Sequence, residues 1–136
     1  MDQVKILIID DDPQNRDILK TRLELAGYLV GEAANGDEGI EISLKEHHDL
    51  IICDLMMPRK DGWQVLKSLR SEPKTQDVPV IILTARTQPI DEMRSWESGA
   101  SEFLAKPVDH ELLIQTVQRL LNGKEAAHGP QENPGH

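Results

Sequence analysis

The fold is decided near the N-terminus, where the apolar run VKILII (residues 4–9) ends abruptly in DDDP (residues 10–13). Isoleucine and valine favour a β-strand, and the proline stops it. Beyond the proline, apolar residues recur at helical spacing from Ile18 to Ala26, and Gly27 closes the segment. The stretch therefore predicts a buried strand, a turn rich in carboxylates and then a helix.

The same alternation continues along the chain. Further strands are predicted at residues 28–33, 50–53, 78–83 and 102–105, and further helices at residues 37–46, 63–69, 89–98 and 112–121. Five strands alternating with five helices predict an α/β fold with a parallel sheet covered on both faces. The first, third and fourth strands are wholly apolar and should be central, whereas the second contains Gly31 and Glu32 and the fifth is short, as at sheet edges. A doubly wound sheet of order 2-1-3-4-5, a flavodoxin-like three-layer sandwich, satisfies these constraints.

Length and composition limit the function classes. A chain of 136 residues predicts one domain, which we place at residues 1–122, followed by a C-terminal tail, linker or vector remnant at residues 123–136. The net charge of −9 argues against direct binding of nucleic acid or an anionic membrane. The single cysteine excludes an intramolecular disulfide, and no apolar run is long enough to span a membrane. We therefore expect a cytoplasmic protein.

Polar residues close four of the predicted strands. They are Asp10 and Asp11 after the first, Asp54 after the third, Thr84 after the fourth and Lys106 after the fifth. In an open parallel sheet, ligands bind beyond the carboxyl ends of the strands, where the winding reverses. Each residue alone has a plainer interpretation as a turn, strand-end or surface residue, and only their joint placement favours a site.

A hard divalent cation would relieve the crowding of these acids. Two carboxylates about 5 Å apart repel by roughly 3 kcal/mol at an effective dielectric constant near 20. Mg²⁺ prefers oxygen ligands, keeps several waters and accepts phosphate oxygens. A carboxylate nucleophile, Mg²⁺, a hydroxyl and a lysine together are suited to phosphoryl transfer.

Other polar residues have plainer interpretations. Asp12, before Pro13, is expected to cap the first helix. His47 and His48 would point about 100° apart on a helix and are expected to be solvated. Strand alternation should turn Cys53 away from the rim and into the core.

Four stretches, taken in order, resemble the receiver domain of two-component response regulators. They are ILIIDDD (residues 6–12), DLMMP with its following DG (residues 54–62), LTA (residues 83–85) and the segment from GA to KP (residues 99–107). The resemblance covers residues 4 to about 121. It implies a signalling domain rather than a conventional enzyme. Such a domain catalyses only its own phosphorylation and slow dephosphorylation.

The resemblance also implies roles for the rim residues. Asp54 would accept a phosphoryl group from a phosphohistidine on a sensor histidine kinase or phosphotransfer protein. Mg²⁺ would be held by Asp54, by Asp11 directly, by Asp10 through water and by the backbone carbonyl of Met56. Lys106 would pair with Asp54 and then with the phosphoryl group.

Two further residues would carry the switch. Thr84 would turn toward the phosphoryl group, and Phe103 would rotate inward into the space left. This change would remodel the face made by the fourth helix, fifth strand and fifth helix, where an effector or output domain docks. Phe103 stands where many members have tyrosine, and its plainer interpretation is packing on an edge strand.

Three alternatives stay open. A haloacid-dehalogenase-type phosphatase would use Asp10 and Asp12 as its Asp-x-Asp start, although Pro13 and the lack of a cap insertion argue against it. A flavodoxin-like electron carrier would need a phosphate loop after the first strand, where three aspartates would repel the FMN phosphate. A degenerate receiver would act only as a docking module.

Overall fold

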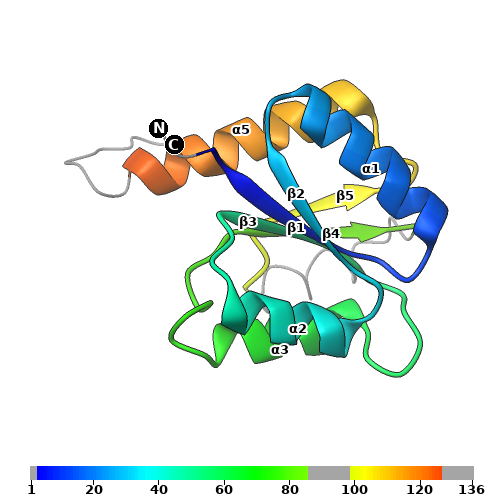
Figure 1. The fold of residues 1–136 in the computed structure, drawn as a ribbon, viewed down its shortest axis with the longest axis vertical. Coiled ribbons are helices and arrows are strands. Elements are labelled where there is room, and N and C mark those ends of the chain that lie inside the picture. Colours follow the sequence, from blue (N-terminus) through cyan, green and yellow to red (C-terminus); the bar gives the residue numbers. More distant parts are fainter. Residues whose placement is uncertain (1–2, 86–98, 127–136) are drawn as a thin grey trace.

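The computed structural model describes residues 3–85 and 99–126 (Figure 1). Its elements in chain order are β1 (Lys5–Ile9), α1 (Pro13–Leu25), β2 (Leu29–Ala33), α2 (Gly36–Lys45), β3 (Leu50–Asp54), α3 (Gly62–Arg70), β4 (Val80–Thr84), β5 (Glu102–Ala105) and α5 (His110–Ala126). The helix expected at residues 89–98 lies outside the described residues. Among the described helices, none is long and apolar enough to cross a membrane.

The five strands form one parallel sheet in the order β2-β1-β3-β4-β5. This order confirms the predicted doubly wound fold, with β2 and β5 at the edges. The central strands β1, β3 and β4 are buried almost throughout. In Figure 1, α1 and α5 cover one face of the sheet, and α2 and α3 cover the other.

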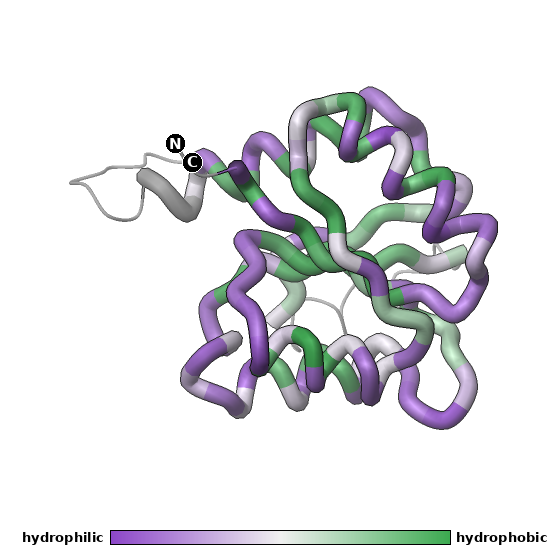
Figure 2. The backbone as a smooth tube through the Cα atoms, in the orientation of Figure 1, coloured by the Kyte–Doolittle hydropathy of each residue, from purple (hydrophilic) through white to green (hydrophobic). Residues whose placement is uncertain are grey.

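Side chains that alternate along each strand enter two separate cores. Leu7, Ile51 and Ile82 belong to the core beneath α2 and α3. Ile8 and Ile52 belong to the core beneath α1 and α5. Figure 2 shows the resulting pattern, with hydrophobic segments along the inner strands and hydrophilic segments on the outer loops. Because the central strands β1, β3 and β4 are buried on both faces, their polar side chains lie at the strand ends.

Polar residues cap the N-termini of the helices that follow the strand ends. The Asp12 carboxylate accepts a hydrogen bond from the backbone N–H of Gln14, which confirms its predicted capping role. At the start of α3, Asp61 and Gln64 form a reciprocal capping box. These caps fix where the chain turns from strand to helix, and so fix the loops around the rim.

One expectation about packing needs correction. His48 is buried rather than solvated, because α2 ends at Lys45 and the extended segment after it turns His48 inward. Helix α5 ends at Ala126, and the domain boundary at residue 122 with the tail from residue 123 stays a prediction.

Candidate functional site

The polar residues predicted at the rim do meet at the carboxyl ends of the strands. Asp10 follows β1, Asp54 ends β3, Thr84 ends β4 and Lys106 follows β5. The Lys106 ammonium Nζ donates a hydrogen bond to Asp54 Oδ1 at 2.9 Å, and it lies 4.0 Å from Asp10 Oδ2. Residues far apart in the chain thus form one cluster because parallel strands end at the same edge.

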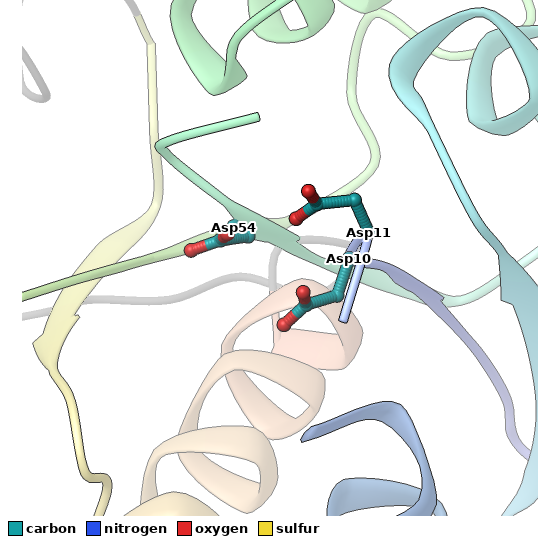
Figure 3. A group of neighbouring side chains, drawn as sticks. All are labelled: Asp10, Asp11 and Asp54. Carbon is teal, nitrogen blue, oxygen red and sulfur yellow. The ribbon is translucent and has the colours of Figure 1, made fainter. Parts of the chain in front are cut away.

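Asp10, Asp11 and Asp54 bring carboxylate oxygens within 4.8 Å of one another (Figure 3). Asp10 is only 1% exposed and Asp54 only 5%, whereas Asp11 is exposed. The cluster therefore has a buried floor and one carboxylate that faces solvent.

Asp10 is held so that one carboxylate oxygen has no hydrogen bond. Its backbone N–H donates to the carbonyl of Ala33 at 3.1 Å, and its Oδ1 accepts from the N–H of Asp12 at 2.9 Å. Within residues 3–85 and 99–126, the buried Oδ2 of Asp10 finds no hydrogen-bond partner. Because buried polar atoms are normally paired, this oxygen points to a ligand at the cluster.

The charges at the rim are strongly coupled. Burial raises the pKa of Asp10, and the hydrogen bond from Asp12 offsets only part of the shift. Burial also raises the pKa of Asp54 against the lowering effect of Lys106. Burial by itself would lower the pKa of Lys106, but the hydrogen bond and charge of Asp54 outweigh it and the pKa is raised. Lys106 therefore stays cationic and neutralises only part of the acidic cluster.

This set of donors fits a hard divalent cation. Three carboxylates, one of them with an unpaired buried oxygen, are the ligand type that Mg²⁺ selects, and no thiolate or imidazole joins them among the described residues. A cation there would relieve the repulsion among the acids and would pair the orphaned oxygen of Asp10.

The end of β3 is fixed by a close backbone approach. The N–H of Leu55 donates to the carbonyl of Leu83 at 2.8 Å, and the N–H of Gly62 donates to the carbonyl of Leu55 at 2.8 Å. A Cβ at Gly62 would lie 2.8 Å from the backbone oxygen of Asp54, so only glycine fits. The loop from β3 to α3 thereby packs directly onto the strand end that carries Asp54.

The remaining predicted residues lie around this cluster. Thr84 is fully buried at the end of β4, and Phe103 is partly buried on the edge strand β5. Met56 follows β3 in the loop and is 58% exposed. Cys53 is fully buried in the core beneath α2 and α3, as predicted, and burial raises the pKa of its thiol.

One residue at the site was not expected from the sequence. Arg16 donates from Nη1 to the backbone carbonyl of Asp10 at 2.7 Å. Its position at the end of the first turn of α1 is near the rim, but an arginine there is normally solvated. Nothing in the sequence pattern indicates that the side chain folds back onto β1.

Comparisons with known proteins agree with this geometry. The family model for the response regulator receiver domain matches residues 6–118. The chain is 43% identical over 117 residues to the DNA-binding dual master transcriptional regulator RpaA of Synechocystis, covering 86% of this chain and 48% of that protein. The chain spans about half the length of several curated relatives, which are named as transcriptional regulators or probable transcriptional regulators.

Solved structures show the same fold. The chemotaxis protein CheY4 of Vibrio cholerae matches with a TM-score of 0.84 at 33% identity, covering 88% of this chain and 99% of that one. The receiver domain of the Pseudomonas aeruginosa sensor histidine kinase PA1611, solved with magnesium in its active-site cleft, matches with a TM-score of 0.82 at 27% identity, covering 89% and 99%. With the rim cluster and the strand order, these matches assign the fold and its class of signalling function. The chain belongs to the family of response regulator receiver domains.

Proposed function

We propose that this receiver domain is a switch that accepts a phosphoryl group on Asp54. The single observation that carries the proposal is the hydrogen bond of 2.9 Å between Lys106 Nζ and Asp54 Oδ1, beside the carboxylates of Asp10 and Asp11. A nucleophilic carboxylate, a fixed cation and an oxygen-rich cation site are the parts that phosphoryl transfer needs.

In the proposed reaction, a carboxylate oxygen of Asp54 attacks the phosphorus of a phosphohistidine on a histidine kinase or phosphotransfer protein. The new O–P bond forms as the P–N bond breaks, and the imidazole leaves with the bonding electrons and takes up a proton. Burial raises the pKa of Asp54, whereas Lys106 stabilises its anionic form, and a cation bound beside it would do the same. Slow hydrolysis of the acyl phosphate returns the domain to its resting state.

Lys106 has a role both before and after the phosphoryl transfer. Before transfer it pairs with Asp54, and afterwards its ammonium can pair with the phosphoryl oxygens. Its raised pKa, with Asp54 as the main stabilising partner, supports a permanent positive charge. A point charge on a flexible stem can follow the charge from the carboxylate to the phosphoryl group.

Mg²⁺ is the proposed cofactor. Asp11 and Asp54, Asp10 through water and the backbone carbonyl of Met56 would hold it. When bound, the ion supplies neutralising charge for the transferring phosphoryl group. The unpaired buried oxygen of Asp10 supports this assignment, as does the magnesium in the cleft of the related PA1611 receiver.

Thr84 and Phe103 are the proposed switch residues. Thr84 lies at the rim in the same sheet as Asp54, one strand away, so its hydroxyl can reach an oxygen that exists only after transfer. A group that interacts with one state only shifts the balance between two conformations. Phe103 would then move into the vacated space and change the face around β5 and α5, where we propose that an effector or output domain docks.

The location and class of partners belong to the same proposal. The net charge of −9 argues that partners are proteins rather than nucleic acid or membrane. A cytoplasmic location suits the single buried and unpaired cysteine.

The test is the intact mass after treatment with acetyl phosphate, with and without Mg²⁺, for wild type, Asp54→Asn and Asp10→Asn. We expect one phosphoryl adduct on wild type, dependent on Mg²⁺ and lost in Asp54→Asn. An adduct that persists in Asp54→Asn but is lost in Asp10→Asn would refute the proposal and favour the phosphatase alternative. No adduct on wild type despite Mg²⁺ binding would also refute the proposal and would favour the alternative of a degenerate receiver that acts only as a docking module.

A further inference from the structure

The side chain of Arg16 joins the end of β1 to the edge strand β2. Its Nη1 donates to the backbone carbonyl of Asp10 at 2.7 Å, and its Nε donates to Glu32 Oε1 at 3.2 Å. The Arg16 side chain is 18% exposed and that of Glu32 is 35% exposed, so the contact with Asp10 is partly buried, whereas the ion pair with Glu32 lies at the surface. The planar guanidinium is suited to two acceptors in fixed directions.

The charge of Arg16 is unfavourable at the N-terminus of its own helix. The N-terminus of a helix carries partial positive charge and favours anions, yet α1 has no acidic residue in its first turn and folds a cation over it. The carbonyl of Asp10 and the carboxylate of Glu32 therefore supply the interactions that keep the guanidinium there.

The contact completes the anchoring of Asp10. The backbone N–H is bonded to Ala33, the carbonyl to Arg16 and Oδ1 to the N–H of Asp12. Only Oδ2 is left without a hydrogen bond among the described residues, and it lies in the carboxylate cluster. The rotation of the Asp10 peptide decides where the next side chain, Asp11, leaves the chain.

We propose that Arg16 is a positioning residue for the cation site, which fixes the turn that carries Asp10 and Asp11 so that their carboxylates meet Asp54. This inference rests on the proposed Mg²⁺ site. Arg16 acts through the backbone of Asp10 and does not itself bind the cation.

The charge of Arg16 and its positioning role predict opposite effects on Mg²⁺ affinity when Arg16 is replaced, which makes the inference testable. A positive charge near the cluster repels Mg²⁺, so removing it should tighten binding if charge alone matters. Removing a group that orients a ligand should weaken binding instead. Lys20 provides the matched control, because it pairs with Glu32 Oε2 at 3.4 Å and, in the described part of the chain, forms no ion pair with Asp10.

The experiment measures the Mg²⁺ dissociation constant by calorimetry for wild type, Arg16→Gln, Arg16→Lys, Lys20→Gln and Asp11→Asn. We expect Arg16→Gln to weaken binding about tenfold, as for other residues that orient metal ligands. Arg16→Lys keeps the charge but cannot span both acceptors, so we expect it to weaken binding as well. Lys20→Gln should bind within a factor of about two of wild type, or slightly more tightly.

A second readout separates positioning from loss of fold. The amide resonance of Asp12, which reports its hydrogen bond to Asp10, should shift in both Arg16 variants and stay in place in Lys20→Gln. Should Arg16→Gln fail to fold, Arg16→Lys alone carries the comparison. The inference is overturned if the folded Arg16 variants bind Mg²⁺ as tightly as Lys20→Gln. Wild type that shows no Mg²⁺ binding, or binding unchanged by Asp11→Asn, would instead refute the cation site itself.

Discussion

Replacing Asp10 by asparagine should stabilise the domain in the absence of divalent cations. Asp10 is 1% exposed, and its Oδ2 lacks a hydrogen bond within the described residues. Asparagine has nearly the same shape and can still accept the hydrogen bond from Asp12 through its side-chain oxygen. The substitution therefore removes a buried charge while keeping the turn intact.

The magnitude follows from the distances at the rim. At an effective dielectric constant near 20, the attraction of Asp10 to Lys106 across 4.0 Å is about 4 kcal/mol. Repulsion from Asp54, within 4.8 Å, is about 3.5 kcal/mol, and repulsion from the exposed Asp11 adds a smaller, screened amount. These charge terms nearly cancel. The cost of burying the unpaired charged oxygen, about 1–3 kcal/mol, is left. The amide nitrogen of asparagine at that place can instead donate to a neighbouring carboxylate, so we expect a gain of about 1–2 kcal/mol at pH 7.

The gain should depend on pH. Burial raises the pKa of Asp10 in the folded state above its unfolded value. The folded state therefore binds the proton more readily, and wild type loses stability as pH rises through the folded pKa. The difference between variant and wild type should be full above that pKa and should disappear as pH falls toward the unfolded value of about 3.8.

Urea unfolding of both proteins, in EDTA and in Mg²⁺ at pH 7, tests this reasoning. For a dissociation constant of about 1 mM, Mg²⁺ at about 10 mM adds roughly 1.4 kcal/mol to wild type. The variant has lost one acidic group and should gain less, so its advantage should shrink or reverse. An Asp10→Asn variant that is less stable than wild type in EDTA would show that the charge of Asp10 supports the fold, and would refute the argument.

Three further predictions concern Gly62, Asp61 and His48. Gly62→Ala places a Cβ 2.8 Å from the backbone oxygen of Asp54, so we expect a loss of at least about 2 kcal/mol in urea unfolding and slower phosphorylation in the mass assay. Asp61→Ala removes the capping box of α3 and should cost about 1 kcal/mol by the same urea method; an unchanged midpoint would contradict it. Burial lowers the pKa of His48, so wild type should lose stability as pH falls below its unfolded pKa of about 6.5. His48→Gln should lack this loss and His47→Gln, altered at an exposed ring, should keep it.

The sequence was sufficient for the architecture because apolar runs and helical spacing are local signals. The wholly apolar runs predicted which strands are central, and Gly31, Glu32 and the shortness of the fifth strand predicted the edges. The order itself is that of a known doubly wound fold which satisfies these constraints. Strand ends were less well predicted. Asp54 and Thr84 are polar, so the loss of strand propensity predicted that the strands end before them. Both residues nevertheless pair with neighbouring strands as part of the sheet.

The sequence could not predict features that depend on how loops turn. His48 was expected on a helix, but α2 ends at Lys45 and the following segment buries the imidazole. Strand and helix patterns do not distinguish the adjacent Asp10 and Asp11, and only the turn after β1 makes one carboxylate buried and the other exposed. The contact between Arg16 and the carbonyl of Asp10 depends on a side-chain conformation that no spacing rule contains.

The convergence of distant residues at one edge of the sheet also limits when the domain can become active. The hydrogen bond between Lys106 and Asp54 joins positions 52 apart in the chain, across β4 and β5. Parallel strands pair only after the intervening crossover has formed, which makes such contacts late in folding. During synthesis, Asp54 leaves the ribosome long before Lys106 is available to pair with it. Under the proposed function, a nascent or partly unfolded chain presents Asp54 without Lys106, so a kinase would transfer its phosphoryl group efficiently only to folded molecules.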